Sequence, residues 1–142
     1  MNHIRYVEYD ARHDAGFVFD VPQGHDCWLL LLTHTPAFFR VDGILTEYPA
    51  KSAVLFAPHT PIHYRASGEL YKNDWIRFDS DENYVSSLPI RNTPFPLPDA
   101  DYCHNLFQLI TWKNSFPGQN NERIVDQLLQ LLFSELQEAS RM

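Results

Sequence analysis

The sequence predicts a mainly β domain, an antiparallel sandwich or barrel, with helices at its C-terminal end. About seven short apolar segments, spaced roughly 8–12 residues apart and separated by turn residues, occupy the first 81 positions, as in such folds. Aromatic residues make up 14% of the chain, which favours strands and a ligand cavity. After position 81, prolines and a helical spacing of apolar residues replace the strand pattern. The 142 residues are enough for one domain with a core of its own.

The strands are expected to follow an N-terminal arm, because residues 1–15 are polar and show no periodicity. The segment Trp28–Leu32 is apolar at every position, so a covering layer must bury the outer side of this strand. Asp42-Gly43 is the strongest hairpin signal in the chain. In order, we expect strands at residues 17–21, 27–34, 37–41, 44–48, 52–57, 61–65 and 74–79.

Two helices are expected after the strands. Residues 83–88 form at most two helical turns, and residues 93–98, with three prolines, form an extended connector. Asp99 can cap a helix that ends near Lys113, and a second helix runs from about residue 120 to Glu138. The predicted organisation is an arm at 1–15, a barrel at 16–92, a connector at 93–98 and helices at 99–142.

The last helix is more apolar than one buried face requires. From Ile124 to Leu136, 8 of the 13 residues are apolar. The helix is therefore either sandwiched inside one domain, or packed on its own barrel and also on a partner. We favour the second alternative, a homodimer through an antiparallel helix pair. The expected interface residues are Val125, Leu128, Leu129, Leu132 and Leu136.

Composition excludes several classes of protein. The net charge is -7 and Lys and Arg form no cluster, which argues against direct nucleic-acid binding. No apolar run reaches the length of a membrane span, and the N-terminus has no signal-peptide core. Cys27 and Cys103 belong to no CxxC pair, so we expect two reduced thiols in a cytoplasmic protein.

Histidines are the obvious candidates for chemistry, but their spacing does not favour a metal site. His25 and His34 are nine residues apart, and Pro58 and Pro61 interrupt the stretch that holds His59 and His63. The HxH spacing of metal-binding β-barrels is absent, so we expect no metal and no other cofactor. The chain also lacks a GxSxG motif and a glycine-rich phosphate loop, and we assign no catalytic residue.

Alternation in the strand at 74–79 suggests a binding cavity. Trp75 and Arg77 share one face of this strand, and Ile76 and Phe78 share the other. One face can then line a cavity while the other lies under a helix. Aromatic faces stack on the C–H surfaces of sugars, and Arg and His supply oriented hydrogen-bond donors. The candidate ligand-binding residues are Trp28, His34, Arg40, His63, Tyr64, Trp75 and Arg77.

Taken in order, these segments resemble the N-terminal domain of AraC-type transcription regulators. The likeness spans residues 16–138 and rests on the order and spacing of loosely similar motifs. The matching segments are Leu29-Leu30-Leu31-Leu32, Phe38-Phe39-Arg40-Val41-Asp42-Gly43, the stretch from Val54 to Tyr64, and Asp74-Trp75-Ile76-Arg77-Phe78.

The resemblance implies a cupin-like double-stranded β-helix, or jelly roll, followed by two antiparallel helices that form a dimer. It also implies a small effector, often a sugar, held without catalysis, and an N-terminal arm that folds over it. The family's sugar-contacting positions match Trp75 and His34. The second of these is Arg in the arabinose-responsive member, so the ligand can differ here.

We therefore expect a cytoplasmic effector-sensing and dimerisation domain of a bacterial AraC-type regulator, with a sugar as the first candidate ligand. The family's helix-turn-helix domain is not in these 142 residues, so we expect an excised sensor that contacts DNA only through that domain. Two alternatives stay open. One is a metal-dependent cupin enzyme using His25, His34, His59 or His63, and the other is a stand-alone carbohydrate-binding module.

Overall fold

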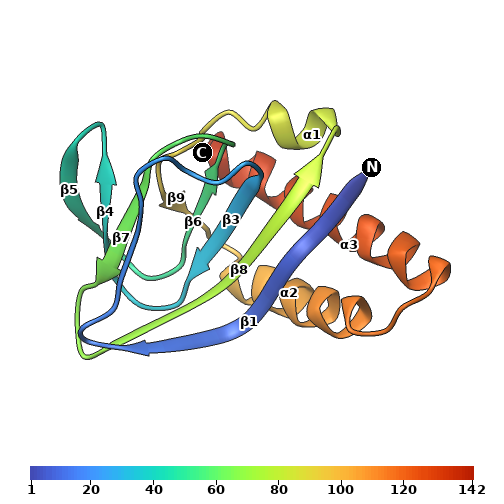
Figure 1. Ribbon diagram of the computed structural model, residues 1–142, viewed down its shortest axis with the longest axis horizontal. Coiled ribbons are helices and arrows are strands. Elements are labelled where there is room, and N and C mark those ends of the chain that lie inside the picture. The colour runs from blue at the N-terminus through green and yellow to red at the C-terminus, as the bar shows by residue number, and fades with distance from the viewer.

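Two antiparallel sheets and a helical layer make up the computed structural model, which describes residues 1–142 except for the side chain of Gln119 (Figure 1). The five-stranded sheet has the order β1 (Asn2–Asp14), β8 (Leu70–Ser80), β3 (Trp28–Thr33), β6 (Ser52–Phe56) and β9 (Phe95–Pro96). The four-stranded sheet has the order β2 (Val18–Val21), β7 (Ile62–Ala66), β4 (Ala37–Val41) and β5 (Ile44–Tyr48). The helices are α1 (Asn83–Ser86), α2 (Ala100–Asn114) and α3 (Gln119–Ser140). This is the mainly β jelly roll with C-terminal helices that the sequence predicts.

The five-stranded sheet is the middle layer, which explains the apolar run in β3. Leu29 and Leu31 belong to the core between the two sheets. Leu30 and Leu32 belong to the second core, between the five-stranded sheet and the helices. The predicted burial of this strand on both sides is confirmed, and the helices supply the covering layer (Figure 1).

The N-terminal residues form a strand where the sequence predicted an arm. Strand β1 pairs with β8 along most of its length, from Asn2 opposite Ser80 to Asp14 opposite Leu70. Register shifts between Ile4 and Tyr6 and between Glu8 and Ala11 interrupt this pairing. Each shift changes which side chains face the sheet, so the alternation that identifies a strand is lost from the sequence. The arm assignment for residues 1–15 is therefore wrong.

The connector and the helices lie where they were expected. Residues 93–98 include β9, a two-residue strand that pairs with β6, and the buried side chains of Phe95 and Leu97. Asp99 is the residue at the start of α2, but its carboxylate makes no capping hydrogen bond within the described structure. Helices α2 and α3 run antiparallel against the five-stranded sheet (Figure 1).

Most of the predicted dimer-interface residues are buried within the chain's own core. Val125, Leu129, Leu132 and Leu136 pack against the sheet and the neighbouring helices, and Leu128 is half-buried beside them. Helix α3 contacts α1, α2 and β9 at once, so it needs an unusually wide apolar face. The sandwiched alternative explains Val125, Leu129, Leu132 and Leu136, so their assignment to a subunit interface is wrong, while that of the half-buried Leu128 stays a prediction.

Two loops at one end of the barrel are tied together by backbone contacts. The amide of His59 donates a 2.7 Å hydrogen bond to the carbonyl oxygen of His25. The backbone of Thr60 lies so close to Gly24 that only a hydrogen fits in place of a side chain. Gly24 has a φ of +71°, a conformation that glycine adopts without strain.

Both cysteines are buried and unpaired with each other, in keeping with the expectation of reduced thiols. Burial raises the pKa of Cys103 to about 12, so this thiol stays protonated at neutral pH. Among the described residues, no helix combines the length and apolarity needed to cross a membrane.

Candidate functional site

A cavity of about 220 Å³ lies between the two sheets. Strands β1, β2, β3, β7 and β8 and the segments beside them contribute to its walls. Its volume is below the roughly 300–1,000 Å³ typical of pockets for drug-sized ligands, so it suits a small molecule. The lining residues are Glu8, His13, Phe17, Phe19, His25, Leu29, Tyr64, Asn73, Trp75 and Arg77.

Side-chain alternation along β8 builds one wall of this cavity. Asn73, Trp75 and Arg77 line the cavity. Ile76 and Phe78 are fully buried on the opposite face of the strand, beneath the helices. The predicted division of this strand into a cavity face and a helix face is confirmed.

Aromatic rings form much of the apolar lining. Phe19 stacks on Tyr64, with 5.0 Å between the ring centroids. Tyr6 stacks on Trp75 at 4.9 Å and an interplanar angle of 16°, which holds the indole plane in place. Burial raises the pKa of Tyr64, so its phenol remains protonated at neutral pH and can donate a hydrogen bond.

Three buried polar atoms beside the cavity have no hydrogen-bond partner within the described structure. They are Nε2 of His25, Oδ1 of Asn73 and Nε of Arg77. Buried polar atoms are normally paired, so unpaired ones around a cavity indicate where a polar ligand could bind. The carboxylate of Glu8 adds an acceptor to the same lining. The cavity therefore offers both donors and acceptors within an aromatic enclosure.

The imidazole of His25, which lines the cavity, makes the stability of the fold depend on pH. Burial, reinforced by the charge of Arg77, lowers the pKa of His25 below 6.5, although Asp26 opposes the shift. Below about pH 6.5 the unfolded chain takes up a proton that the folded chain binds less readily, so the free energy of unfolding falls as pH falls. When the pH is lowered from about 8 to about 5, we expect the melting temperature of His25→Gln to fall less than that of the wild type. Melting curves by circular dichroism would measure this, and parallel losses in the two proteins would contradict the assignment.

The structure brings together three of the seven predicted ligand residues. Tyr64, Trp75 and Arg77 all line the cavity. Trp28 packs on the helix-facing core instead, because it shares a strand face with Leu30 and Leu32. Its assignment to the cavity lining is wrong.

The other three predicted residues also lie outside the cavity. Arg40 and His63 line a separate surface hollow of about 610 Å³, where Nδ1 of His63 lies 3.0 Å from Oδ1 of Asp20. Alternation explains this, since His63 neighbours Tyr64 in β7 and must face the other way. His34 lies on the helix side of the five-stranded sheet, 2.8 Å from Asp74.

The four histidines considered for a cupin metal site do not gather at one point in the described structure. His25 lines the cavity, while His63 lies in the outer hollow. His34 faces the helices and His59 is exposed on a loop. This arrangement gives no support to a barrel metal centre built from these side chains.

Several cavity residues were not predicted from the sequence. Glu8 and His13 belong to β1, whose register shifts hid the strand. Asn73 could have been found, because it shares the strand face of Trp75 and Arg77. The alternation of Phe17 and Phe19 was visible, but only the fold shows that these rings face the cavity.

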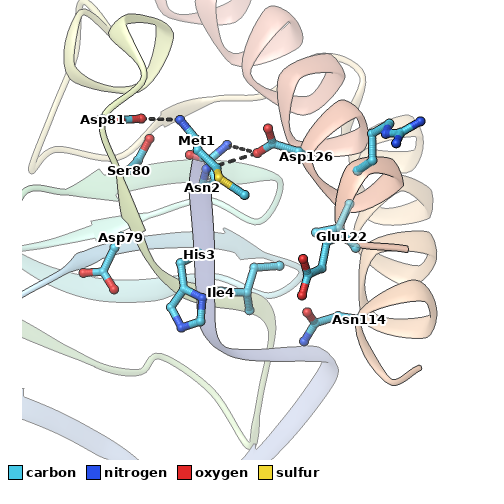
Figure 2. A pocket seen from close by; sticks show the side chains of 12 residues that line it. Met1, Asn2, His3, Ile4, Asp79, Ser80, Asp81, Asn114, Glu122 and Asp126 are labelled. Atoms are coloured by element: carbon cyan, nitrogen blue, oxygen red, sulfur yellow. Dashed lines mark hydrogen bonds and ion pairs between the residues drawn. The ribbon is translucent and has the colours of Figure 1, made fainter. Parts of the chain in front are cut away.

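A larger hollow of about 840 Å³ lies at the surface between the start of β1, the end of β8 and α3 (Figure 2). The side chain of Asn2 donates a 2.8 Å hydrogen bond to Asp126, and the amino group of Met1 pairs with Asp81 and Glu82. The first contact joins β1 to α3, and the second joins the N-terminus to the residues that follow β8. Polar and charged residues make up most of its lining, which has no aromatic side chain other than His3, unlike the cavity between the sheets.

Solved structures show which proteins share this fold. The AraC-like transcriptional activator CuxR is 12% identical, with a TM-score of 0.58 over 88% of this chain and 48% of that one. ToxT from Vibrio cholerae is also 12% identical, with a TM-score of 0.50 over 99% of this chain and 57% of that one. The chain thus spans about half the length of each, and the likeness shows a common fold. No protein-family model matches the chain, and no curated protein matches it either.

Proposed function

We propose that this chain is the effector-binding and dimerisation domain of an AraC-type transcription regulator, with a sugar as the first candidate ligand. The observation that carries the proposal is the aromatic cavity with unpaired polar atoms, set in a fold that it shares with CuxR and ToxT. The domain acts by binding rather than by catalysis, and a separate domain of the regulator contacts DNA. The acidic net charge of -7 agrees with a domain that does not itself contact the DNA phosphates.

The cavity chemistry suits a monosaccharide-sized ligand. The faces of Trp75 and Tyr64 can pack on apolar C–H surfaces. The guanidinium of Arg77 and the side chains of His25 and Asn73 can hydrogen-bond to hydroxyl groups, each replacing a missing partner. Glu8 can accept from a further hydroxyl. A ligand with one apolar face and a rim of hydroxyl groups matches this lining.

Strand β8 offers a route from the ligand to the helices. One face of β8 carries Asn73, Trp75 and Arg77, and the other carries Ile76 and Phe78 in the helix-facing core. A ligand that favours one position of this strand also favours one packing of α2 and α3. The ligand can shift the equilibrium between two packings of α2 and α3 by no more than the difference in its binding free energy for them.

Exposed apolar side chains on the helices support dimerisation with a second copy. Leu109 and Trp112 lie one turn apart on α2 and are 40% and 61% exposed. Leu131 on α3 is 50% exposed, one turn from the half-buried Leu128. Leu109, Trp112 and Leu131 are exposed and do not belong to the core beneath the helices, whereas Leu128 packs at its edge. We propose that these exposed side chains form the dimer interface, rather than the core residues predicted from the sequence.

Replacing Trp75 by alanine is expected to weaken ligand binding at least about tenfold, since a stacked aromatic contact contributes on the order of 1 kcal/mol beyond its burial. The probes are a panel of aldopentoses, aldohexoses and uronic acids, screened by thermal shift and then by titration calorimetry. Trp28→Ala is the matched control on the opposite face of the sheet. It should lower the melting temperature but keep the affinity within about twofold. Equal losses in both variants would contradict the cavity assignment.

A further inference from the structure

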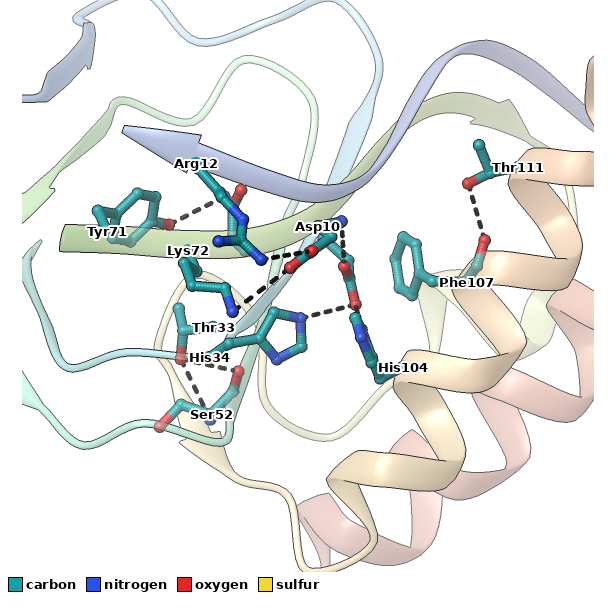
Figure 3. Close-up of polar contacts among 12 residues, drawn as sticks. Asp10, Arg12, Thr33, His34, Ser52, Tyr71, Lys72, His104, Phe107 and Thr111 are labelled. Carbon is teal, nitrogen blue, oxygen red and sulfur yellow. Dashed lines mark hydrogen bonds and ion pairs between the residues drawn. The ribbon is translucent and has the colours of Figure 1, made fainter. Parts of the chain in front are cut away.

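Three side chains that are far apart in the sequence meet between the five-stranded sheet and α2 (Figure 3). His34 follows β3, Asp74 lies in β8 and His104 lies in α2. Nε2 of His34 is 2.8 Å from Oδ2 of Asp74, and Nδ1 of His104 is 2.7 Å from the same oxygen. Asp74 is fully buried, whereas the side chains of His34 and His104 are 18% and 26% exposed. The cluster thus has a buried carboxylate and an edge open to solvent.

The surrounding residues hold this cluster in position. The backbone amide of Asp10 donates a 2.8 Å hydrogen bond to Oδ1 of Asp74, so Oδ2 is left to the imidazoles. Asp10 has a φ of +56° within the second register shift of β1, which frees this amide from the strand pairing. The ring of Tyr9 stacks on His104 at 4.4 Å. Contacts of this kind orient the ligands of metal ions in proteins.

The geometry at His34 is poor for an ordinary hydrogen bond. Although Nε2 lies 2.8 Å from Oδ2 of Asp74, it has no hydrogen-bond partner within the described structure, because its N–H direction does not point at that oxygen. Hydrogen bonding therefore explains the contact of His104 with Asp74 but leaves His34 unexplained. One potential ligand atom from each of the three residues lies within 4.8 Å of the others, close enough for one ion to bind all three.

We propose that His34, Asp74 and His104 bind a divalent transition-metal ion, with Zn²⁺ as the first candidate. Two imidazoles and one carboxylate suit Zn²⁺ and similar ions, and three protein ligands leave a further position for water. Metal–ligand distances of about 2.0–2.2 Å require the donor atoms to separate by roughly half an ångström from their present contacts. Rotation of the partly exposed imidazoles can supply this movement.

The ion would connect parts of the molecule that the proposed sensing function needs to couple. It would tie α2 to the end of β3 and to β8, directly behind the cavity residues Asn73 and Trp75. Metal binding would then favour one packing of α2 on the sheet. The site itself does not depend on the proposed sugar ligand, because it lies between the sheet and α2 and none of its three residues lines the cavity.

Zinc titration of chelator-treated, metal-free chain tests the site. With a chromophoric chelator as competitor, we expect one Zn²⁺ per chain. The melting temperature should rise by about 5–10 °C when free Zn²⁺ exceeds its dissociation constant a hundredfold. His104→Ala should weaken Zn²⁺ binding at least about a hundredfold. His63→Ala is the matched control, because this histidine also contacts an aspartate but lies in the outer hollow.

Unchanged zinc affinity in His104→Ala, or an equal loss in His63→Ala, would overturn the proposal. A wild type that binds no stoichiometric zinc would overturn it as well. If His104→Ala does not fold, Co²⁺ bound to the wild type provides the second test. Imidazole and carboxylate ligation should give Co²⁺ the visible absorption of a four-coordinate ion, and a spectrum identical to aqueous Co²⁺ would refute the site.

Discussion

Replacing Leu132 by aspartate is expected to unfold the chain. The side chain of Leu132 is fully buried among Leu129, Phe133 and Leu136 in the core beneath the helices. An unpaired carboxylate there costs several kcal/mol, and the lost packing of leucine adds about 2–5 kcal/mol. The total is of the same order as the roughly 5–15 kcal/mol by which a domain is stable. Circular dichroism followed on heating should show no cooperative melting transition.

Leu131→Asp is the matched control one residue away. Leu131 is 50% exposed on α3, so a charge there remains hydrated and should change the melting temperature by only a few degrees. If the helices pair two copies, the same charge should raise the dimer dissociation constant at least about tenfold. Sedimentation velocity at micromolar concentrations measures this. A wild type that is monomeric under these conditions would refute the dimer, whatever the variants do.

Replacing Gly24 by alanine is expected to destabilise the fold by about 3 kcal/mol. A Cβ atom at this position would lie 2.3 Å from the carbonyl oxygen of Thr60 and 2.6 Å from its amide nitrogen, so the backbone must move. The φ of +71° adds the strain of a left-handed conformation. The melting temperature should fall by roughly 10 °C in thermal denaturation. The loop that moves carries His25, so the cavity should also be disturbed.

Gly68→Ala provides the comparison for Gly24→Ala. A Cβ atom at Gly68 meets no atom within 4 Å, and its φ is not in the left-handed region. We expect its stability to stay within about 0.5 kcal/mol of the wild type. Similar losses in the two variants would show that the loops carrying Gly24 and Thr60 are not packed as described.

Most strands could be predicted from the sequence because each shows a regular pattern over five or more residues. Every predicted strand from residue 17 to residue 79 is present in the structure, with shifts at the ends. Strand β1 was not predicted because two register shifts remove the alternation of its side chains. Strand β9 has only two residues, one of them proline, and exists because β6 offers an edge to pair with. Such local elements depend on tertiary contacts that no short window of sequence contains.

The site was predicted only in part, for a related reason. Alternation correctly separated Trp75 from Ile76, and the same rule could have separated Trp28 from Leu29 or His63 from Tyr64. Alternation alone does not tell which face of a strand meets the cavity, since β3 is apolar on both. The cluster of His34, Asp74 and His104 has no sequence signature, because its members lie on three separate elements.

Cavity-facing and helix-facing residues alternate along β8, which limits the sequence changes that this strand can accept. Residues 73, 75 and 77 border the cavity, while residues 74, 76 and 78 face the helices. Point substitutions at the odd positions change the cavity lining without enlarging or shrinking the core beneath the helices. Deleting one residue within this strand would instead exchange the two sets and place apolar side chains in the cavity. The cavity wall formed by this segment therefore tolerates substitution but not insertion or deletion.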